Sequence, residues 1–159
     1  MLVLDASVVV DFLLSRPPHA SAIAARIRES APDLAAPELL DVEVAQVLRR
    51  FVLRGELPAE RAEAALEHLQ GLPVMRYPHG ALVQRAFQLR DNATVYDAVY
   101  VALAEGLGGT LLTLDARLMG EPGHAAVIEV VGAQLGPAEG RGSLPGGDGS
   151  RDSTTTKTR

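Results

Sequence analysis

Apolar residues along the chain fall either in short continuous runs or at helical spacing, and the two patterns alternate. Residues 2–4 form a run too short for a helix and too continuously apolar for a half-exposed strand, which predicts a strand buried on both faces. Further strands are predicted at 33–36, 74–75, 110–114 and 127–131. Helices are predicted at 8–14, 19–30, 38–54, 59–70, 80–90 and 94–106, with a short one at 115–119.

This alternation determines the expected fold class. Strands that alternate with helices are typical of a parallel sheet with helices on both faces. A chain of 159 residues suffices for one domain with a sizeable core, which we place at residues 1–133. From residue 136 onward the chain is rich in Gly, Ser, Thr and Pro and has almost no apolar residues. Residues 134–159 are therefore predicted to be a disordered C-terminal tail.

The composition excludes several classes of protein. Cysteine is absent, which rules out disulfide frameworks and thiolate chemistry, and the single lysine, Lys157, cannot serve a P-loop or a Schiff base in the domain. No uncharged apolar run approaches the roughly 20 residues that span a bilayer, and the N-terminus lacks a signal-peptide pattern. We therefore expect a soluble protein of the cytoplasm. A net charge of −5 argues against a broad basic face for nucleic acid, but not against a small metal site that handles it.

Three aspartates lie where an apolar segment gives way to a turn or a helix start: Asp5, Asp97 and Asp115. Each can simply cap the helix that follows, and Thr94 to Asp97 matches a capping box. Asp5 and Asp115, however, directly follow strands that are expected to be central and parallel, so both should project from the same edge of the sheet. Glu43 lies on a shoulder of the apolar stripe of helix 38–54, from which it can face that crevice or solvent.

A group of acids in one crevice is unfavourable by itself, because neighbouring carboxylates repel one another. Hard divalent cations remove this repulsion, and Mg²⁺ and Mn²⁺ prefer oxygen ligands. The usual task of such a site is to activate water for attack on a phosphodiester. The sequence therefore predicts that Asp5, Glu43, Asp97 and Asp115 hold Mg²⁺ or Mn²⁺ for catalysis.

Other kinds of site fit the sequence less well. The histidines are scattered without an i, i+4 pair: His19, His68, His79 and His124. Aromatic residues are few, and three are predicted to lie in the core, so we expect no stacking platform for single-stranded RNA: Phe12, Phe51 and Phe87. If a nucleic acid binds, arginines must supply the phosphate contacts. The candidates are Arg16, Arg50, Arg54, Arg90 and Arg117.

Four segments of the chain carry these acids in a recognisable order. They are VLDASVVVDFLL with Asp5, PELLDVEVAQVLRR with Glu43, NATVYDAVYVALAE with Asp97 and LLTLDARL with Asp115. Over residues 1–131 the four resemble the acidic motifs of PIN-domain ribonucleases, specifically VapC-type toxins of bacterial type II toxin–antitoxin pairs. Each motif alone is weak, whereas four in order are specific. Glu38 and Asp41 are close to Glu43 in the sequence. Of the three, Glu43 is the acid that the family pattern favours, because Glu43 precedes the segment AQVLRR.

The resemblance implies a compact three-layer α/β/α sandwich with a central, mainly parallel sheet. It also implies a Mg²⁺- or Mn²⁺-dependent endoribonuclease that acts on RNA as the toxin of the pair. A homodimer and a small VapB-like antitoxin that covers the active site are expected as well. In such proteins Ser7 and Thr113 would support the acidic site by hydrogen bonding.

Two alternative functions remain open from the residues. A catalytically inactive PIN-like module would keep the fold and only engage a partner protein, but it would have no need of like charges that require a cation. A phosphatase-like hydrolase with Asp5 as its nucleophile would need a second aspartate where this chain has Ser7. It would also need a lysine within the domain, which is absent.

Overall fold

The computed structural model describes residues 1–120 and 122–132, and its centre is a five-stranded sheet in the order β3-β2-β1-β4-β5. Every pairing between neighbouring strands is parallel. The strands are β1 Leu2–Leu4, β2 Leu34–Pro37, β3 Met75–Tyr77, β4 Thr110–Thr113 and β5 Val127–Val130. The prediction of a mainly parallel sheet is confirmed, while the predicted tail, 134–159, lies outside the described residues.

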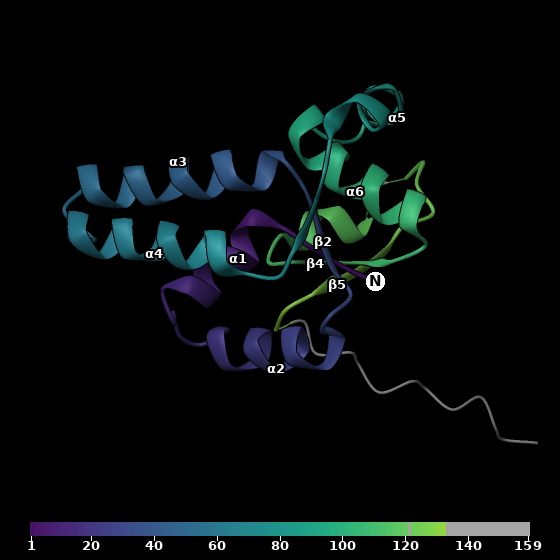
Figure 1. Cartoon of the computed structure of the whole chain (residues 1–159). Helices are drawn as coiled ribbons and strands as arrows, with labels where there is room; N and C mark the ends of the chain where they lie inside the picture. The colour runs from purple at the N-terminus through teal and green to yellow at the C-terminus, as the bar shows by residue number, and fades with distance from the viewer. Residues whose placement is uncertain (121, 133–159) are drawn as a thin grey trace, which may run out of the picture.

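Helices lie on both sides of this sheet (Figure 1). They are α1 Ala6–Leu13, α2 Ala20–Ser30, α3 Leu39–Leu53, α4 Ala59–Gly71, α5 Val83–Gln88 and α6 Val95–Leu107, with 3₁₀ turns η1 His79–Ala81 and η2 Ala116–Gly120. Helix α6 packs on β1, β2 and β4, whereas α2 lies on the other side of the sheet (Figure 1). None of the helices in the described part of the chain is long and apolar enough to cross a membrane.

The order of the strands reverses at β1, which makes this strand the topological centre. From β1 the chain proceeds outward through β2 and β3, and then continues on the other side with β4 and β5. Open α/β sheets bind their ligands at the carboxyl ends of the strands beside such a reversal. Leu4 is in register with Leu112, so the residues that follow these two, Asp5 and Thr113, are neighbours at that edge.

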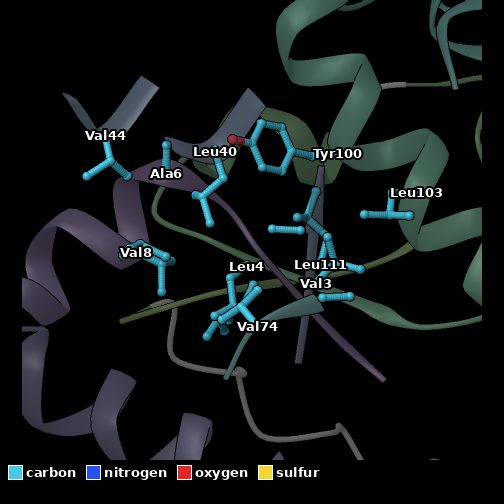
Figure 2. Packing of buried hydrophobic residues seen from close by; sticks show 14 of the residues in the cluster. Val3, Leu4, Ala6, Val8, Leu40, Val44, Val74, Tyr100, Leu103 and Leu111 are labelled. Atoms are coloured by element: carbon cyan, nitrogen blue, oxygen red, sulfur yellow. The ribbon is translucent and has the colours of Figure 1, made fainter. Parts of the chain in front are cut away.

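The core is built around β1, because helices cover both faces of the sheet. Val3 and Leu4 are completely buried, and Val8 in the first turn of α1 continues the buried run. Figure 2 shows Tyr100 of α6 among these apolar residues, with its oxygen pointing towards Leu40 of α3. A buried phenol hydroxyl needs a hydrogen-bond partner, so Tyr100 is a polar contact within an apolar layer.

The third strand lies at Met75–Tyr77 rather than at the predicted residues 74–75. Its central residue is Arg76, whose charge does not fit an apolar strand pattern. The Arg76 guanidinium donates to Asp41 and to the carbonyl oxygens of Leu69 and Val74. Asp41 lies in α3, Leu69 in α4, and Val74 directly before the strand, so the apolar pattern could not reveal these contacts.

The predicted helix 80–90 is divided into η1 and α5, and the prediction that Phe87 lies in the core is wrong. Leu82, Ala86 and Leu89 are buried, so they form the inner face of this segment. Phe87 falls on the opposite face and is 58% exposed, with the Arg90 guanidinium 5.2 Å from the centre of its ring. Phe12 and Phe51 do pack against the core, although both are only partly buried.

Gly109 permits the close approach of the chain before β4 to the start of β1. A Cβ at this position would lie 2.7 Å from the carbonyl oxygen of Met1, which accepts a hydrogen bond from Thr110. Because the obstacle is backbone at the beginning of the central strand pairing, we expect Gly109→Ala to lower the free energy of unfolding by about 1–3 kcal/mol. Urea unfolding followed by circular dichroism measures this change.

Gly106→Ala is the matched control, because Gly106 lies in α6 and an added Cβ would meet nothing within 4 Å. Alanine favours a helix over glycine by about 0.5–1 kcal/mol. We therefore expect this variant to be at least as stable as the original chain. Equal destabilisation by the two substitutions would contradict the steric role of Gly109.

Candidate active site

Asp5 directly follows β1 at the carboxyl edge of the sheet. It occupies the N-cap position of α1, but its side chain makes no capping hydrogen bond. Its Oδ2 instead accepts two hydrogen bonds of 2.6 Å, one from the Ser7 hydroxyl and one from the Thr113 hydroxyl. Burial raises the pKa of the Asp5 carboxyl despite these hydrogen bonds, and the charge of Asp97 adds to the increase.

The two hydroxyls are themselves fixed by backbone N–H groups. Ser7 Oγ accepts a hydrogen bond from the N–H of Leu114 at 3.1 Å, and Thr113 Oγ1 accepts one from the N–H of Asp115 at 3.0 Å. Each hydroxyl has a single proton to donate, and both direct that proton at Asp5. Thr113 is completely buried, which keeps water from competing for the contact. The pair therefore orients the Asp5 carboxylate.

Glu43 enters the same site from α3. Its Oε2 accepts a 2.6 Å hydrogen bond from the Tyr100 hydroxyl. Burial raises the pKa of Glu43, and the charges of Asp5 and Asp97 raise it further. Glu43 is therefore electrostatically coupled to both aspartates, although 38 residues separate it from Asp5 along the chain.

The two other acids near the start of α3 face different surroundings. Glu38 is exposed to solvent, and Asp41 forms an ion pair of 3.0 Å with Arg76 of β3. Of the three carboxylates that the sequence offered here, Glu43 is the one held by a buried tyrosine. Glu43, at the edge of the apolar stripe of α3, is therefore directed towards the buried Tyr100 and is not simply a solvent-exposed residue.

Tyr100 is the residue of this site that the sequence reasoning missed. Burial and the hydrogen bond to Glu43 raise the pKa of Tyr100 well above its usual value, so the phenol keeps its proton and acts as a donor. A signal was present in the sequence, because Tyr100 is three residues after Asp97 and therefore on the same side of α6. A tyrosine hydroxyl in the buried part of an otherwise apolar helix needs a hydrogen-bond partner, and this requirement could have indicated a contact with the site.

Asp97 lies in the first turn of α6, and its environment combines capping with proximity to the other acids. Its backbone N–H donates to Thr94 Oγ1 at 3.2 Å, so Thr94 caps the helix as predicted. In return the Thr94 hydroxyl donates to Asp97 Oδ2 at 2.7 Å. The charge of Asp97 raises the pKa values of Asp5 and Glu43, which places Asp97 in the same electrostatic cluster.

Asp115 follows β4 and is held in a different way from the other three acids. Arg117 donates to it from Nε at 2.9 Å and from its backbone N–H at 3.0 Å, both to Oδ1. These contacts hold the pKa of Asp115 below its usual value. Asp115 therefore lies near the carboxyl edge beside Thr113 with its charge compensated by a guanidinium, whereas Asp5, Glu43 and Asp97 interact with one another.

The other arginines considered for phosphate contacts lie on the exposed surface. Three of them have acidic partners close in sequence: Arg16 with Asp11, Arg54 with Glu56 and Arg90 with Asp91. Arg50 is exposed in the last turn of α3. Exposed ion pairs are weak, so these guanidinium groups can exchange partners readily. Their proposed contacts with phosphates stay a prediction.

The acids provide the oxygen donors that a hard cation requires, although they do not form a closed cage. Within residues 1–120 and 122–132, no three acidic, histidine or cysteine side chains are arranged closely enough to hold one metal ion. Mg²⁺ does not need such a cage, because it keeps several waters and usually binds through one or two carboxylates. Asp5 and Asp97 supply a fitting pair, since Asp5 is buried and the like charge of Asp97 raises its pKa further, a repulsion that a cation would relieve.

The unfavourable burial of Asp5 predicts that Asp5→Asn stabilises the fold when a chelator is present. Asparagine keeps an oxygen for the hydroxyls of Ser7 and Thr113, but it removes the buried charge. A carboxyl with a raised pKa binds more protons in the native state, so its ionisation destabilises the fold above that pKa. We expect a higher free energy of unfolding for this variant at alkaline pH, and we expect the gain to disappear as the pH falls below the usual aspartate pKa.

Thermal unfolding in EDTA at alkaline and at acidic pH measures this effect. Asp91→Asn is the control, because Asp91 is 78% exposed and its replacement should change stability by less than about 0.5 kcal/mol. A gain for Asp5→Asn that grew on acidification would be the opposite of the expected linkage and would refute the argument.

Residues 2–120 match the PIN domain family. Two similar proteins come from Mycobacterium tuberculosis. Ribonuclease VapC1 is 45% identical over 130 residues, which cover 81% of this chain and 96% of that protein. Ribonuclease VapC12 is 44% identical over 131 residues, which cover 82% of this chain and 99% of that protein.

Two solved structures have a similar fold at low sequence identity. One is VapBC2 from Rickettsia felis bound to a DNA fragment from its promoter, with a TM-score of 0.63 at 13% identity over 82% of this chain and 98% of that chain. The other is DNA-bound VapBC from Salmonella typhimurium, with a TM-score of 0.62 at 17% identity over 81% and 96%. Together with the matches in sequence, this agreement shows that the chain belongs to the PIN domain family.

Proposed function

We propose that this chain is a metal-dependent endoribonuclease that hydrolyses RNA phosphodiesters as the toxin of a toxin–antitoxin pair. One observation carries the proposal: Asp5, Glu43 and Asp97 come from three different parts of the chain, and the charge of Asp97 raises the pKa of both Asp5 and Glu43. The two relatives from M. tuberculosis support it, because both are named ribonucleases and the chain spans nearly their whole length.

Mg²⁺ or Mn²⁺ is the cofactor that suits these donors, with Asp5 and Asp97 as its main ligands and Glu43 and Asp115 completing the acidic set. When bound, such an ion supplies a water of lowered pKa and stabilises the charge on the leaving oxygen. The Asp5 Oδ2 is committed to the Ser7 and Thr113 hydroxyls, so Oδ1 is the oxygen that Asp5 offers. Thr94 holds the Asp97 carboxylate through Oδ2 in the same manner.

Glu43 is the group that we assign to proton transfer. Tyr100 fixes Oε2, so Oε1 is the atom that would accept the proton of the attacking water. Because burial raises the pKa of Glu43, this carboxylate is a stronger base than an exposed glutamate. Asp115 has a lowered pKa and stays ionised, so it would act as an acceptor and not as a proton donor.

A small VapB-like antitoxin is the proposed protein partner, since the two solved neighbours are VapBC assemblies. Homodimer formation and the phosphate contacts of the surface arginines are further predictions from the family resemblance. The alternative of a catalytically inactive interaction module receives less support. Such a module would have no reason to keep Asp5, Glu43 and Asp97 in mutually unfavourable positions.

Cleavage assays of the two central aspartates test the proposed function. The chain, purified free of any partner, should cleave a structured RNA in the presence of Mg²⁺ or Mn²⁺ and should stop when EDTA is added. Asp5→Asn and Asp97→Asn should lower the rate by more than the roughly 10–100-fold that loss of an outer-shell partner costs. The exposed Asp91→Asn variant should retain full activity. Equal cleavage by all four proteins would refute the assignment.

Thr113 provides a more selective test of the support around Asp5. Thr113→Val removes the hydroxyl at nearly constant volume, so we expect a loss of roughly 10–100-fold in cleavage rate. Thr113→Ser keeps the hydroxyl and should retain most of the activity, although it removes a buried methyl group. If both variants were equally impaired, packing and not the hydrogen bond would be the function of Thr113.

A further inference from the structure

Tyr96 is a large aromatic residue that the fold leaves mostly in solvent. It lies in the first turn of α6, directly before Asp97, and it is 64% exposed. Thr94 already caps this end of the helix through the N–H of Asp97, so Tyr96 is not required for that role. A single exposed apolar residue needs no explanation by itself, but the location of Tyr96 is unusual.

The geometry of α6 places Tyr96 on the side of the helix that carries the acidic site. Tyr96 and Tyr100 are four residues apart and therefore lie one above the other on the helix surface. Tyr100 is turned towards the site, because its hydroxyl donates to Glu43. Asp97, three residues before Tyr100, shares the same side. Tyr96 is therefore the solvent-exposed end of the face of α6 that carries Asp97 and Tyr100.

The small number of aromatic residues argues against a platform of several rings, but one exposed ring can stack on one base. We infer that Tyr96 binds the RNA substrate by stacking on an unpaired base next to the phosphodiester at the Asp5–Asp97 site. This inference rests on the proposed ribonuclease function. Proteins recognise single-stranded RNA largely by stacking its splayed bases on aromatic side chains. The chain has a net charge of −5, so long-range electrostatics do not favour the binding of RNA. Stacking between an aromatic ring and a base does not depend on net charge, so it can contribute to binding in spite of this charge.

Phe87 is the natural comparison, because it is also aromatic and exposed. It lies on α5, which carries none of the four acids, and its ring is already covered on one side by the Arg90 guanidinium. Tyr96, in contrast, lies one helical turn before Tyr100, whose hydroxyl donates to Glu43 of the candidate site. The proposed base contact is therefore assigned to Tyr96 and not to every exposed aromatic ring.

Steady-state kinetics with a stem-loop RNA whose single-stranded loop is randomised provide the first test. The main cleavage product of the wild-type chain in Mn²⁺ defines one sequence, which is then synthesised as a short substrate. Stacking acts equally in the ground and transition states, so we expect Tyr96→Leu to raise KM roughly 10-fold with little change in kcat. Tyr96→Phe keeps the ring and should resemble the wild type, and Phe87→Leu should leave KM unchanged.

Substrates with one abasic nucleotide identify the base that stacks. Removing the base that contacts Tyr96 should raise KM for the wild type, but it should have little further effect on Tyr96→Leu, because the contact is already lost. If every abasic position impaired Tyr96→Leu as much as the wild type, the inference would be wrong while the ribonuclease function stood. Failure of the wild type to cleave any RNA would overturn both. Unchanged kinetics with weaker antitoxin binding would assign Tyr96 to the protein interface instead.

Discussion

The site depends on the burial of one carboxylate at the end of the central strand. Asp5 follows β1, where the strand order reverses, so helices and neighbouring strands surround it. Burial in this position raises the pKa of Asp5, and the charge of Asp97 raises it further. Stability alone would favour an apolar residue or an amide at this position. The retained charge therefore points to a ligand that binds there, in keeping with the tendency of strongly perturbed groups to mark functional sites.

A second constraint joins two helices that are far apart in the sequence. The Tyr100–Glu43 hydrogen bond connects α6 to α3, and the two residues are separated by 57 positions. Tyr100 is buried and lies beside apolar side chains of the core (Figure 2), so packing restrains its position. The hydrogen bond from Tyr100 therefore sets the orientation of Glu43, so this part of the candidate site is held by a residue of the core.

The sequence was most informative where burial and position along a strand determine the outcome. The apolar runs located the strands, and the strand ends located Asp5 and Asp115, because a parallel sheet brings its carboxyl ends together. Contacts between side chains distant in sequence could not be read in this way. Tyr100 appeared to be an ordinary core residue, and the central Arg76 of β3 depends on partners in α3 and α4. Phe87 was assigned to the core from its hydrophobicity, although the spacing of its neighbours places it outside.

The type of hydrogen-bond donor separates the roles of the four acids. Three of them are held by neutral hydroxyl groups: Asp5 by Ser7 and Thr113, Glu43 by Tyr100, and Asp97 by Thr94. A hydroxyl orients a carboxylate without cancelling its charge, so the negative charge of these three acids is not compensated by their hydrogen-bond donors. Asp115 is held by the guanidinium of Arg117, which compensates its charge and keeps its pKa low. If the donors were all cationic, the same four acids would form a stable network with little affinity for a metal ion. The neutral donors around Asp5, Glu43 and Asp97 thus leave the charge of these carboxylates uncompensated, as the proposed metal site requires.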